Sequence, residues 1–257
     1  MNISTFSAKP TYILSAGDSQ RYLEVMGDRS DPAKGIGRLA SAIVNYKHRI
    51  KNLQVRAVSA PEQADVLVYC RKVGDSLDIA VDYCRTTEAA LIFLSSDIDT
   101  SNIVPDNFIF ITAPNSSLEV IRYMNLIRLL AKNEYQGWQP KIVEHHQEAK
   151  KDVSQTAKKI ADMLGVDHSS IESVRDFAKT SAQYKIPHSS RDGYAVHSII
   201  FIDKNTGHKS KPIDMVVHGR ESYASGVFEI YKLLCDYSSH LKPGKYDVTD
   251  LLANTEA

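Results

Sequence analysis

The fold is decided by the stretch DVLVYCRKVGDSLDIAVDYCRTTEAALIFL (65–94). Its first six residues, 65–70, form a continuous apolar run, as expected for a strand buried on both faces of a sheet. The middle carries apolar residues at spacings that could line one face of a helix, namely Leu77, Ile79, Ala80, Val81 and Cys84. Residues 90–94 form a second apolar run. A strand, a helix and a strand in succession predict a parallel sheet with crossover helices.

Two further short apolar runs flank this unit, at residues 53–58 and 108–111. The runs that end at Leu94 and Ile111 are both followed by small polar residues. Ligands of open α/β sheets bind outside the carboxyl ends of the strands, so a cofactor is expected at these endings. The residues expected to contact it are Ser95, Ser96, Ala113 and Asn115.

A change of period separates the second part of the chain from the first. Residues 117–133 predict a long amphipathic helix, and the segment at 136–140 marks a boundary. The pattern beyond it predicts a strand at 141–144, helices at 156–164 and 171–178, paired strands at 196–202 and 213–217 around a turn at 204–207, and a closing helix at 225–234.

The composition is that of an ordinary globular protein, with 43% hydrophobic and 24% charged residues. Lysine plus arginine equals aspartate plus glutamate, 31 against 31, which argues against a nucleic-acid-binding protein. Three scattered cysteines are too few for a disulfide framework or a zinc site, which fits a reducing compartment; no metal site is expected. No signal peptide or membrane-spanning run is evident. We therefore expect a cytoplasmic protein.

A candidate dinucleotide loop lies near the N-terminus, between an apolar run at 22–27 and a predicted helix at 39–46. The compact G-x-G-x-x-G spacing is absent. Glycines close to a helix start let the backbone approach a phosphate, and Arg38 or Lys34 could pair with it. The candidate cofactor residues are Gly27, Gly35, Gly37 and Arg38. The alternative is a surface loop in which the glycines serve turns.

The densest polar cluster is the segment EHHQEAKKDVSQTA (144–157). Its histidines, His145 and His146, can donate or accept protons near neutral pH. Lys150 and Lys151 supply positive charge for an anionic substrate, and the N-terminus of the following helix attracts a carboxylate. Together these groups indicate a pocket for a small polycarboxylate that gains a proton. The alternative is a solvated loop that caps a helix.

This cluster resembles the signature E-x-H-H-x-x-K-x-D-A-P-S-G-T-A of the dihydrodipicolinate reductase family. Three more segments agree with that family in order and spacing. APNS (113–116) resembles A-P-N-F/S, RESYASG (220–226) resembles R-x-x-F-A-x-G, and KPGKYDVTDLL (242–252) resembles K-P-G-x-Y-x-M-x-D-V-L. The resemblance runs from about Asp65 to the end of the chain.

The resemblance implies a homotetrameric reductase that passes hydride from NADPH or NADH to a cyclic unsaturated dicarboxylate imine in lysine (diaminopimelate) biosynthesis. The family's H-x-x-x-K-x-D spacing assigns the proton-donating histidine to His146 and the substrate-binding lysine to Lys150. Asp152 then matches the motif aspartate, and Thr156 the threonine that holds a substrate carboxylate. A nearby acid and cation would stabilise the negative charge that hydride delivery builds on the substrate.

The segment departs from the family pattern at two positions that are also expected to contact substrate. The family's next histidine is Gln147, which can form hydrogen bonds but cannot supply a proton or positive charge. The glycine at the helix entrance is Gln155, whose side chain could reshape the carboxylate pocket. Two alternatives stay open: a diverged oxidoreductase for another cyclic imine or keto acid, and a non-catalytic binding relative with a decayed cofactor loop.

The expected fold class is α/β, with a Rossmann-like nucleotide-binding domain and a second α+β domain that has an open mixed sheet. The first domain is expected at residues 1–115, rejoined by 220–257, and the substrate-binding and oligomerisation domain at 116–219. Arg56 is a candidate for setting the preference between NADH and NADPH. His197 is expected to be structural. The loop containing His188, Arg191 and Asp192 could line a pocket.

Overall fold

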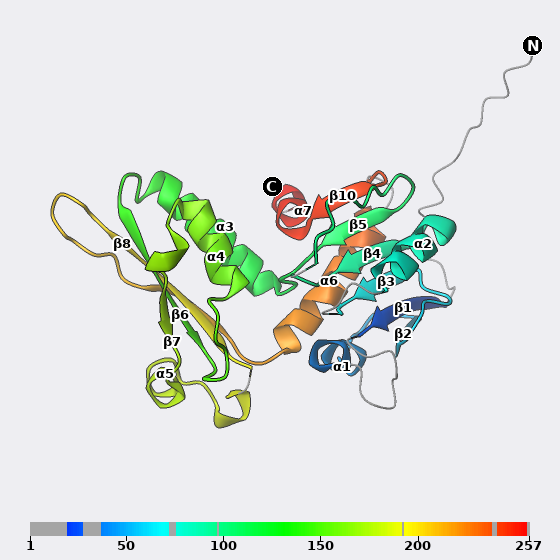
Figure 1. Cartoon of the computed structure of the whole chain (residues 1–257), viewed down its shortest axis with the longest axis horizontal. Helices are drawn as coiled ribbons and strands as arrows, with labels where there is room; N and C mark the ends of the chain where they lie inside the picture. Colours follow the sequence, from blue (N-terminus) through cyan, green and yellow to red (C-terminus); the bar gives the residue numbers. More distant parts are fainter. Residues whose placement is uncertain are drawn as a thin grey trace, which may run out of the picture.

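The computed structural model describes residues 20–27, 37–71, 76–96, 98–191, 193–237 and 241–255. They form two β-sheets, each with helices packed against it, at opposite ends of the molecule (Figure 1). The predicted α/β class is confirmed. Among the described residues, no helix has both the length and the apolar character needed to cross a membrane.

The first sheet has six parallel strands in the order β2-β1-β3-β4-β5-β10. They are β1 (Arg21–Met26), β2 (Leu53–Ala57), β3 (Val66–Tyr69), β4 (Ala90–Phe93), β5 (Ile109–Thr112) and β10 (Gly244–Asp247). Every residue of β3 and β4 is buried, as the continuous apolar runs predict. The parallel order brings the carboxyl ends of these strands to one edge of the sheet.

Separate hydrophobic cores cover the two faces of this sheet. On one face, α2 (Leu77–Thr87) packs its buried residues against Leu67 and Phe93. On the other, α1 (Arg38–Val44) and α6 (Glu221–Tyr237) pack together over Val68. Each strand contributes to both cores because successive side chains point to opposite faces.

The second sheet has four strands in the order β7-β6-β8-β9. They are β6 (Gln139–His146), β7 (Glu172–Val174), β8 (Ala195–Ile202) and β9 (Ile213–Val217). β6 and β7 are parallel, and the other pairs are antiparallel, so the predicted pairing of β8 with β9 is confirmed. The helices are α3 (Leu118–Asn133) and α4 (Gln155–Leu164) on one face, α5 (Phe177–Tyr184) on the other, and α7 (Val248–Thr255) after β10.

The prediction of a helix at residues 171–178 is wrong. Residues Glu172–Val174 form the edge strand β7, which pairs with β6 in parallel, and α5 starts only at Phe177. The side chain of Asp176 accepts a hydrogen bond from the Lys179 backbone N–H at 3.0 Å. This N-cap sets the start of α5, and the apolar residues before it belong to an extended segment.

A close contact between α6 and the segment before α3 joins the two halves of the molecule. A Cβ atom on Gly226 would lie 1.6 Å from the carbonyl oxygen of Ser116, so only glycine fits there. Ser116 Oγ donates to the Tyr223 carbonyl at 2.8 Å, and Ser222 Oγ donates to Ser117 Oγ at 3.1 Å. The segment RESYASG therefore holds α6 against the point where the chain passes between the sheets.

Candidate active site

The carboxyl end of β6 sends its polar side chains to opposite faces of the second sheet. Glu144 and His146, two residues apart, share the face on which α4 begins. His145 points to the other face, where its Nδ1 lies 3.0 Å from Thr180 Oγ1 and its ring meets Tyr184 edge-on. The two neighbouring histidines of the polar cluster thus lie in different environments.

Glu144 is fully buried and accepts hydrogen bonds on both carboxylate oxygens. Oε1 accepts from Arg175 Nη2 at 2.7 Å and from Ser173 Oγ at 2.9 Å. Oε2 accepts from the Ser154 backbone N–H at 3.0 Å. Burial raises the pKa of this carboxyl, but the hydrogen bonds from Ser154 and Arg175 outweigh burial and lower the pKa to about 2. Glu144 is therefore negatively charged at neutral pH.

His146 lies beside this carboxylate with one ring nitrogen unpaired. Its Nε2 is 3.6 Å from Glu144 Oε2 and has no hydrogen-bond partner within the described parts of the chain. Burial lowers the pKa of His146 to about 4; the charges of Lys150 and Arg175 act in the same direction, and Glu144 opposes them. The imidazole is therefore neutral at neutral pH. The Tyr194 hydroxyl donates to the His146 carbonyl at 2.8 Å and holds the end of β6.

His197 of β8 completes the cluster, although its place in a predicted strand favoured a structural role. The register of β6 and β8 sets His197 directly opposite Glu144, and its ring meets that of His146 edge-on at 5.6 Å between centroids. Its Nε2 lies 3.1 Å from Ser154 Oγ, while Nδ1 has no hydrogen-bond partner among the described residues. Burial lowers its pKa to about 3. The sequence alone does not give the register that brings these residues together.

Arg175 is another residue of this site that the sequence did not single out. In addition to Glu144, its guanidinium donates to the backbone carbonyls of Lys150 at 2.8 Å and Asp152 at 3.1 Å. Arg175 therefore holds the polar loop after β6 and adds positive charge near His146. An arginine after a short edge strand carries no sequence signal for these contacts.

Glu144, His146 and His197 also match the donor types of a metal site. One ligand atom from each lies within 4.8 Å of the other two, and neutral imidazoles and carboxylates are ligands of Zn²⁺. Arg175 and Lys150, however, place positive charge beside the cluster, which opposes a divalent cation. The Glu144 carboxylate already accepts hydrogen bonds on both oxygens. The cluster is therefore better suited to proton transfer than to a metal ion.

The N-terminus of α4 meets the carboxyl edge of the first sheet. Ser154 caps the helix, because its Oγ accepts from the Ala157 backbone N–H at 3.1 Å. Thr156 Oγ1 accepts from Asn115 Nδ2 at 3.0 Å, so a predicted substrate residue contacts a predicted cofactor residue. A cavity of about 50 Å³ lies at this junction, and Gln155 is among its lining residues.

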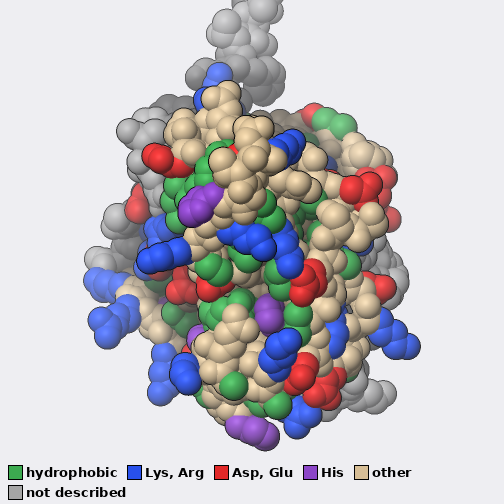
Figure 2. Space-filling model, turned by 90° about the vertical axis from the view of Figure 1, so that its left-hand side faces the viewer, with side chains coloured by type: hydrophobic (Ala, Val, Ile, Leu, Met, Phe, Trp, Pro, Cys, Tyr) green, Lys and Arg blue, Asp and Glu red, His purple; other side chains and the backbone are tan. Residues whose placement is uncertain are grey.

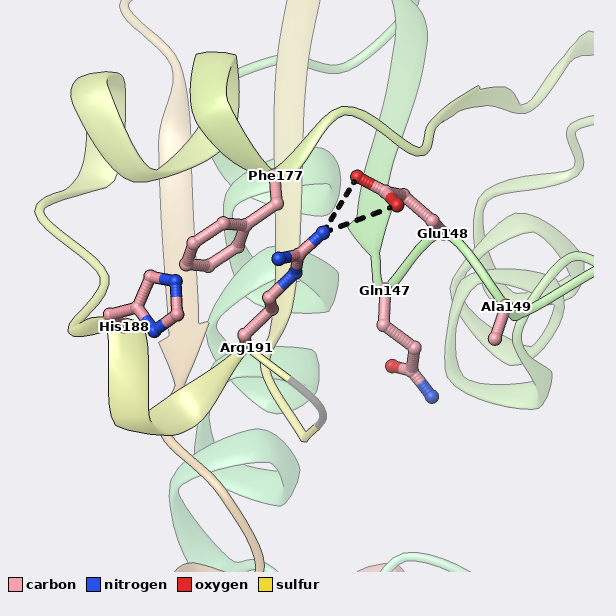
Figure 3. Close-up of a pocket in the computed structure, with 6 residues that line it drawn as sticks. All are labelled: Gln147, Glu148, Ala149, Phe177, His188 and Arg191. Carbon is pink, nitrogen blue, oxygen red and sulfur yellow. Dashed lines mark hydrogen bonds and ion pairs between the residues drawn. The ribbon is translucent and has the colours of Figure 1, made fainter.

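Gln147, which was also expected to contact substrate, lies in a different and larger pocket of about 470 Å³ (Figure 3). This pocket is lined by Gln147, Glu148, Ala149, Phe177, His188 and Arg191. The Arg191 guanidinium lies over the Phe177 ring, 5.5 Å from its centroid, and 3.4 Å from Glu148 Oε2. The loop expected to line a pocket therefore does so, although Asp192 lies outside the described residues. Gln155 and Thr156 do not line this pocket.

The expected cofactor residues follow the ends of neighbouring parallel strands. Gly27 is buried directly after β1, Ser95 and Ser96 come shortly after β4, and Ala113 is buried directly after β5. Asn115 Oδ1 accepts from a backbone N–H at the start of α3 at 3.2 Å. The parallel pairing of these strands places all five residues along one edge of the sheet.

The loop between β1 and α1 is described only at its two ends. Gly37 has a φ of 82°, a conformation that favours glycine, and Arg38 is the exposed first residue of α1. Gly35 and Lys34 lie outside the described residues. The residues that are described fit a dinucleotide, because a buried glycine ends β1 and a second glycine opens the next helix.

The chain is similar to one known protein family and to several solved structures. The family model described as "Dihydrodipicolinate reductase, C-terminus" matches residues 120–252, which is just over half of the chain. No curated protein matches the sequence. A solved structure of a dipicolinate-bound dihydrodipicolinate reductase from Paenisporosarcina sp. TG-14 has a TM-score of 0.61 at 15% identity, over 90% of this chain and 99% of that chain.

Two other solved structures are less similar. A myo-inositol-1-phosphate synthase-related protein from Thermotoga maritima MSB8 has a TM-score of 0.43 at 10% identity, over 71% of this chain and 57% of that chain. A meso-dapdh mutant with DAP from Clostridium tetani E88 has a TM-score of 0.42 at 11% identity, over 90% and 94% of the two chains. Of these three structures, only the reductase is similar enough to support a shared fold.

Proposed function

This chain belongs to the dihydrodipicolinate reductase family, and we propose that it reduces a cyclic unsaturated dicarboxylate imine with NADPH or NADH, as in dihydrodipicolinate reduction in lysine biosynthesis. One observation carries the proposal. At the carboxyl end of β6, His146 presents an unpaired Nε2 beside the buried Glu144 carboxylate, close to the charges of Lys150 and Arg175. A proton donor and cations in one site suit an anionic substrate that gains a proton.

The groups around His146 suit a substrate with two carboxylates. Lys150 and Arg175 provide positive charge, and the start of α4, at Gln155 and Thr156, provides backbone amides at the positive end of a helix. The hydrogen bond from Asn115 to Thr156 joins this helix start to the cofactor edge. A substrate held at α4 would therefore lie within reach of a dinucleotide bound along that edge.

The lowered pKa of His146 shapes its part in the reaction. Without substrate the imidazole is neutral, since burial lowers its pKa to about 4. Two substrate carboxylates beside the ring would raise that pKa, so substrate binding is coupled to proton uptake. A bound nicotinamide cofactor supplies the hydride. His146 then donates its Nε2 proton to the substrate atom on which negative charge develops.

The first test is oxidation of NADPH and NADH with freshly generated dihydrodipicolinate, followed by absorbance. The wild type should turn over the substrate, and His146→Gln should lower kcat roughly 10²- to 10⁴-fold, the usual contribution of general acid–base catalysis. His145→Gln is the matched control and should stay within a few-fold of wild type, because His145 contacts Thr180 on the opposite face. Equal turnover by wild type and His146→Gln would remove His146 from the chemistry.

A second candidate is a diverged oxidoreductase that uses the same dinucleotide on another cyclic imine or keto acid. The presence of Gln155 at the start of α4 favours it, because this side chain lines the small cavity where a carboxylate would bind. Nucleotide binding by a folded protein without turnover of dihydrodipicolinate would support this candidate. A protein that binds neither nucleotide would instead be a non-catalytic relative.

The same family membership leads us to propose a homotetramer built on the face of the second sheet that α5 covers only in part. Val143, Ile200 and Val216 share that face, are only partly buried, and lie beside the exposed Lys141 and Asp214. Figure 2 views this end of the molecule, where hydrophobic side chains reach the surface in patches between basic and acidic ones. The mass in solution tests the proposal, and a monomer at micromolar concentration would contradict it.

A further inference from the structure

Arg71 occupies the carboxyl edge of the first sheet, two residues after β3. Its side chain is buried, with the residue only 7% exposed. Nη2 donates to the Ser59 carbonyl at 2.7 Å, and Nη1 donates to Ser76 Oγ. Ser95, a predicted cofactor residue, donates its hydroxyl to the Arg71 carbonyl. Arg71 therefore lies among the loops that follow β2, β3 and β4.

Among the described residues, nothing balances the charge of this guanidinium. Its hydrogen-bond partners, Ser59 and Ser76, are neutral, and Nε has no partner at all among the described residues. No carboxylate within the described ranges forms an ion pair with Arg71. Buried charges in proteins are normally paired, because an uncompensated charge is costly to remove from water. An anionic ligand would supply the missing charge.

The N-terminus of α2 lies beside the same guanidinium and also attracts an anion. Ser76 is the N-cap residue of this eleven-residue helix, yet its side chain makes no capping hydrogen bond. Its Oγ accepts from Arg71 instead. The first backbone amides of α2 are thus left without the usual side-chain acceptor, at the positive end of the helix.

The contact between Arg71 and Ser59 indicates which part of a dinucleotide Arg71 would contact. Ser59 comes two residues after the end of β2, and in dinucleotide-binding folds the region after the second strand meets the 2′ position of the adenosine ribose. An arginine there accommodates the 2′-phosphate of NADPH. We propose that Arg71, together with the start of α2, binds this 2′-phosphate, an inference that rests on the proposed dinucleotide binding.

Arg56 was the residue that the sequence suggested for setting the preference between NADH and NADPH. Its guanidinium instead pairs with Glu24. Its Nε donates to Glu24 Oε1 at 2.8 Å, and its guanidinium lies over the Tyr22 ring, 5.2 Å from the centroid. Glu24 is fully buried and also accepts from the Glu62 backbone N–H at 2.8 Å. This carboxylate already neutralises Arg56, whereas nothing described neutralises Arg71.

The test measures the affinities of the full-length protein for NADPH and NADH by isothermal titration. The wild type should bind NADPH more tightly, and Arg71→Gln should weaken NADPH binding roughly 10- to 100-fold, as expected for hydrogen bonds to a charged group. NADH affinity should stay unchanged. Arg56→Gln is the matched control and should leave the ratio of the two affinities as in the wild type.

Competition with two adenosine phosphates tests the same proposal without a substitution. In the wild type, 2′,5′-ADP should compete with NADPH far better than 5′-ADP does. If Arg71→Gln fails to fold, equal competition by the two in the wild type overturns the proposal, and so does a wild type that prefers NADH. An Arg71→Gln protein that loses both dinucleotides equally would make Arg71 a structural link between loops. A folded wild type that binds neither dinucleotide contradicts the proposed function itself.

Discussion

Glu144 and His146 are held in different charge states although their facing atoms lie only 3.6 Å apart. Hydrogen bonds from Ser154 and Arg175 keep the carboxyl ionised, and burial keeps the imidazole neutral. At neutral pH the Glu144 carboxyl is therefore ionised and the His146 imidazole is uncharged. The cluster is poised to take up a proton when its surroundings become more negative.

The two histidines of this cluster should make the fold sensitive to mild acid. The pKa of His146 is lowered to about 4 and that of His197 to about 3, both by burial, from an ordinary value of 6.5. At a pH between the ordinary and the lowered values, the unfolded chain binds more protons than the folded one. Stability that is present above pH 6.5 is therefore lost as the pH falls from there towards the lowered folded-state pKa values.

Urea unfolding at about pH 7 and about pH 5 checks this prediction. His197→Gln keeps a polar group next to Ser154 but does not titrate, so its free energy of unfolding should change less between the two pH values. His208→Gln, at an exposed position, is the control and should behave as the wild type does. The same pH dependence in wild type and His197→Gln would contradict the assignment of acid sensitivity to this cluster.

At the scale of elements, the strands and helices that were predicted correctly are those whose apolar pattern lies within the element's own sequence. The apolar runs of β3 and β4 are buried on both faces, and the long amphipathic helix is α3, at Leu118–Asn133. The exception is β7, because residues Glu172–Val174 are extended only through their parallel pairing with β6. Such a short edge strand gains its hydrogen bonds from a distant segment, which no local pattern records.

The close contact between α6 and the segment before α3 can be tested by substituting Gly226. Gly226→Ala would place a Cβ atom 1.6 Å from the Ser116 carbonyl oxygen, so the helix must shift away. We expect a loss of unfolding free energy of roughly 1–3 kcal/mol or more, as overpacking of a tight contact costs. Denaturant unfolding measures it.

Glu229→Ala on the same helix is the matched control for this substitution. Glu229 forms an exposed ion pair with Lys232, so its removal should change the unfolding free energy by no more than about 0.5 kcal/mol. Equal stability of wild type and Gly226→Ala would show that α6 can move without cost, and the close approach would then not constrain the junction.

At the scale of the whole molecule, the proposed site depends on how the two sheets meet. The hydrogen bond from Asn115 to Thr156 crosses this junction. Thr156→Val keeps the shape of the side chain but removes the acceptor, so we expect KM for the proposed imine substrate to rise roughly 3- to 10-fold, the worth of one hydrogen bond. Thr156→Ser retains the hydroxyl and should restore KM. Identical KM values for wild type and Thr156→Val would exclude a part for this contact in substrate binding.

The same junction leads us to propose two domains, at residues 1–115 rejoined by 220–257, and at 116–219. The strands of the first range and β10 form the parallel sheet, whereas β6 to β9 form the mixed sheet. α6 carries the chain back from the second sheet to the first, beside α1 (Figure 1). Limited proteolysis that cuts near both proposed boundaries, and leaves two protected cores, would support this division.

The sequence by itself determined the parallel sheet, the family resemblance and the candidate proton donor. Apolar runs, turn residues and helix periods are local, and the motif around His146 and Lys150 is contiguous, so both can be read along the chain. Only the tertiary structure decided what surrounds them. The strand register brought His197 to Glu144, β7 brought Arg175 there, and the loops after β2 and β4 enclosed Arg71. Such pairings depend on chain segments far apart in sequence, whose approach is set by the packing of the whole core.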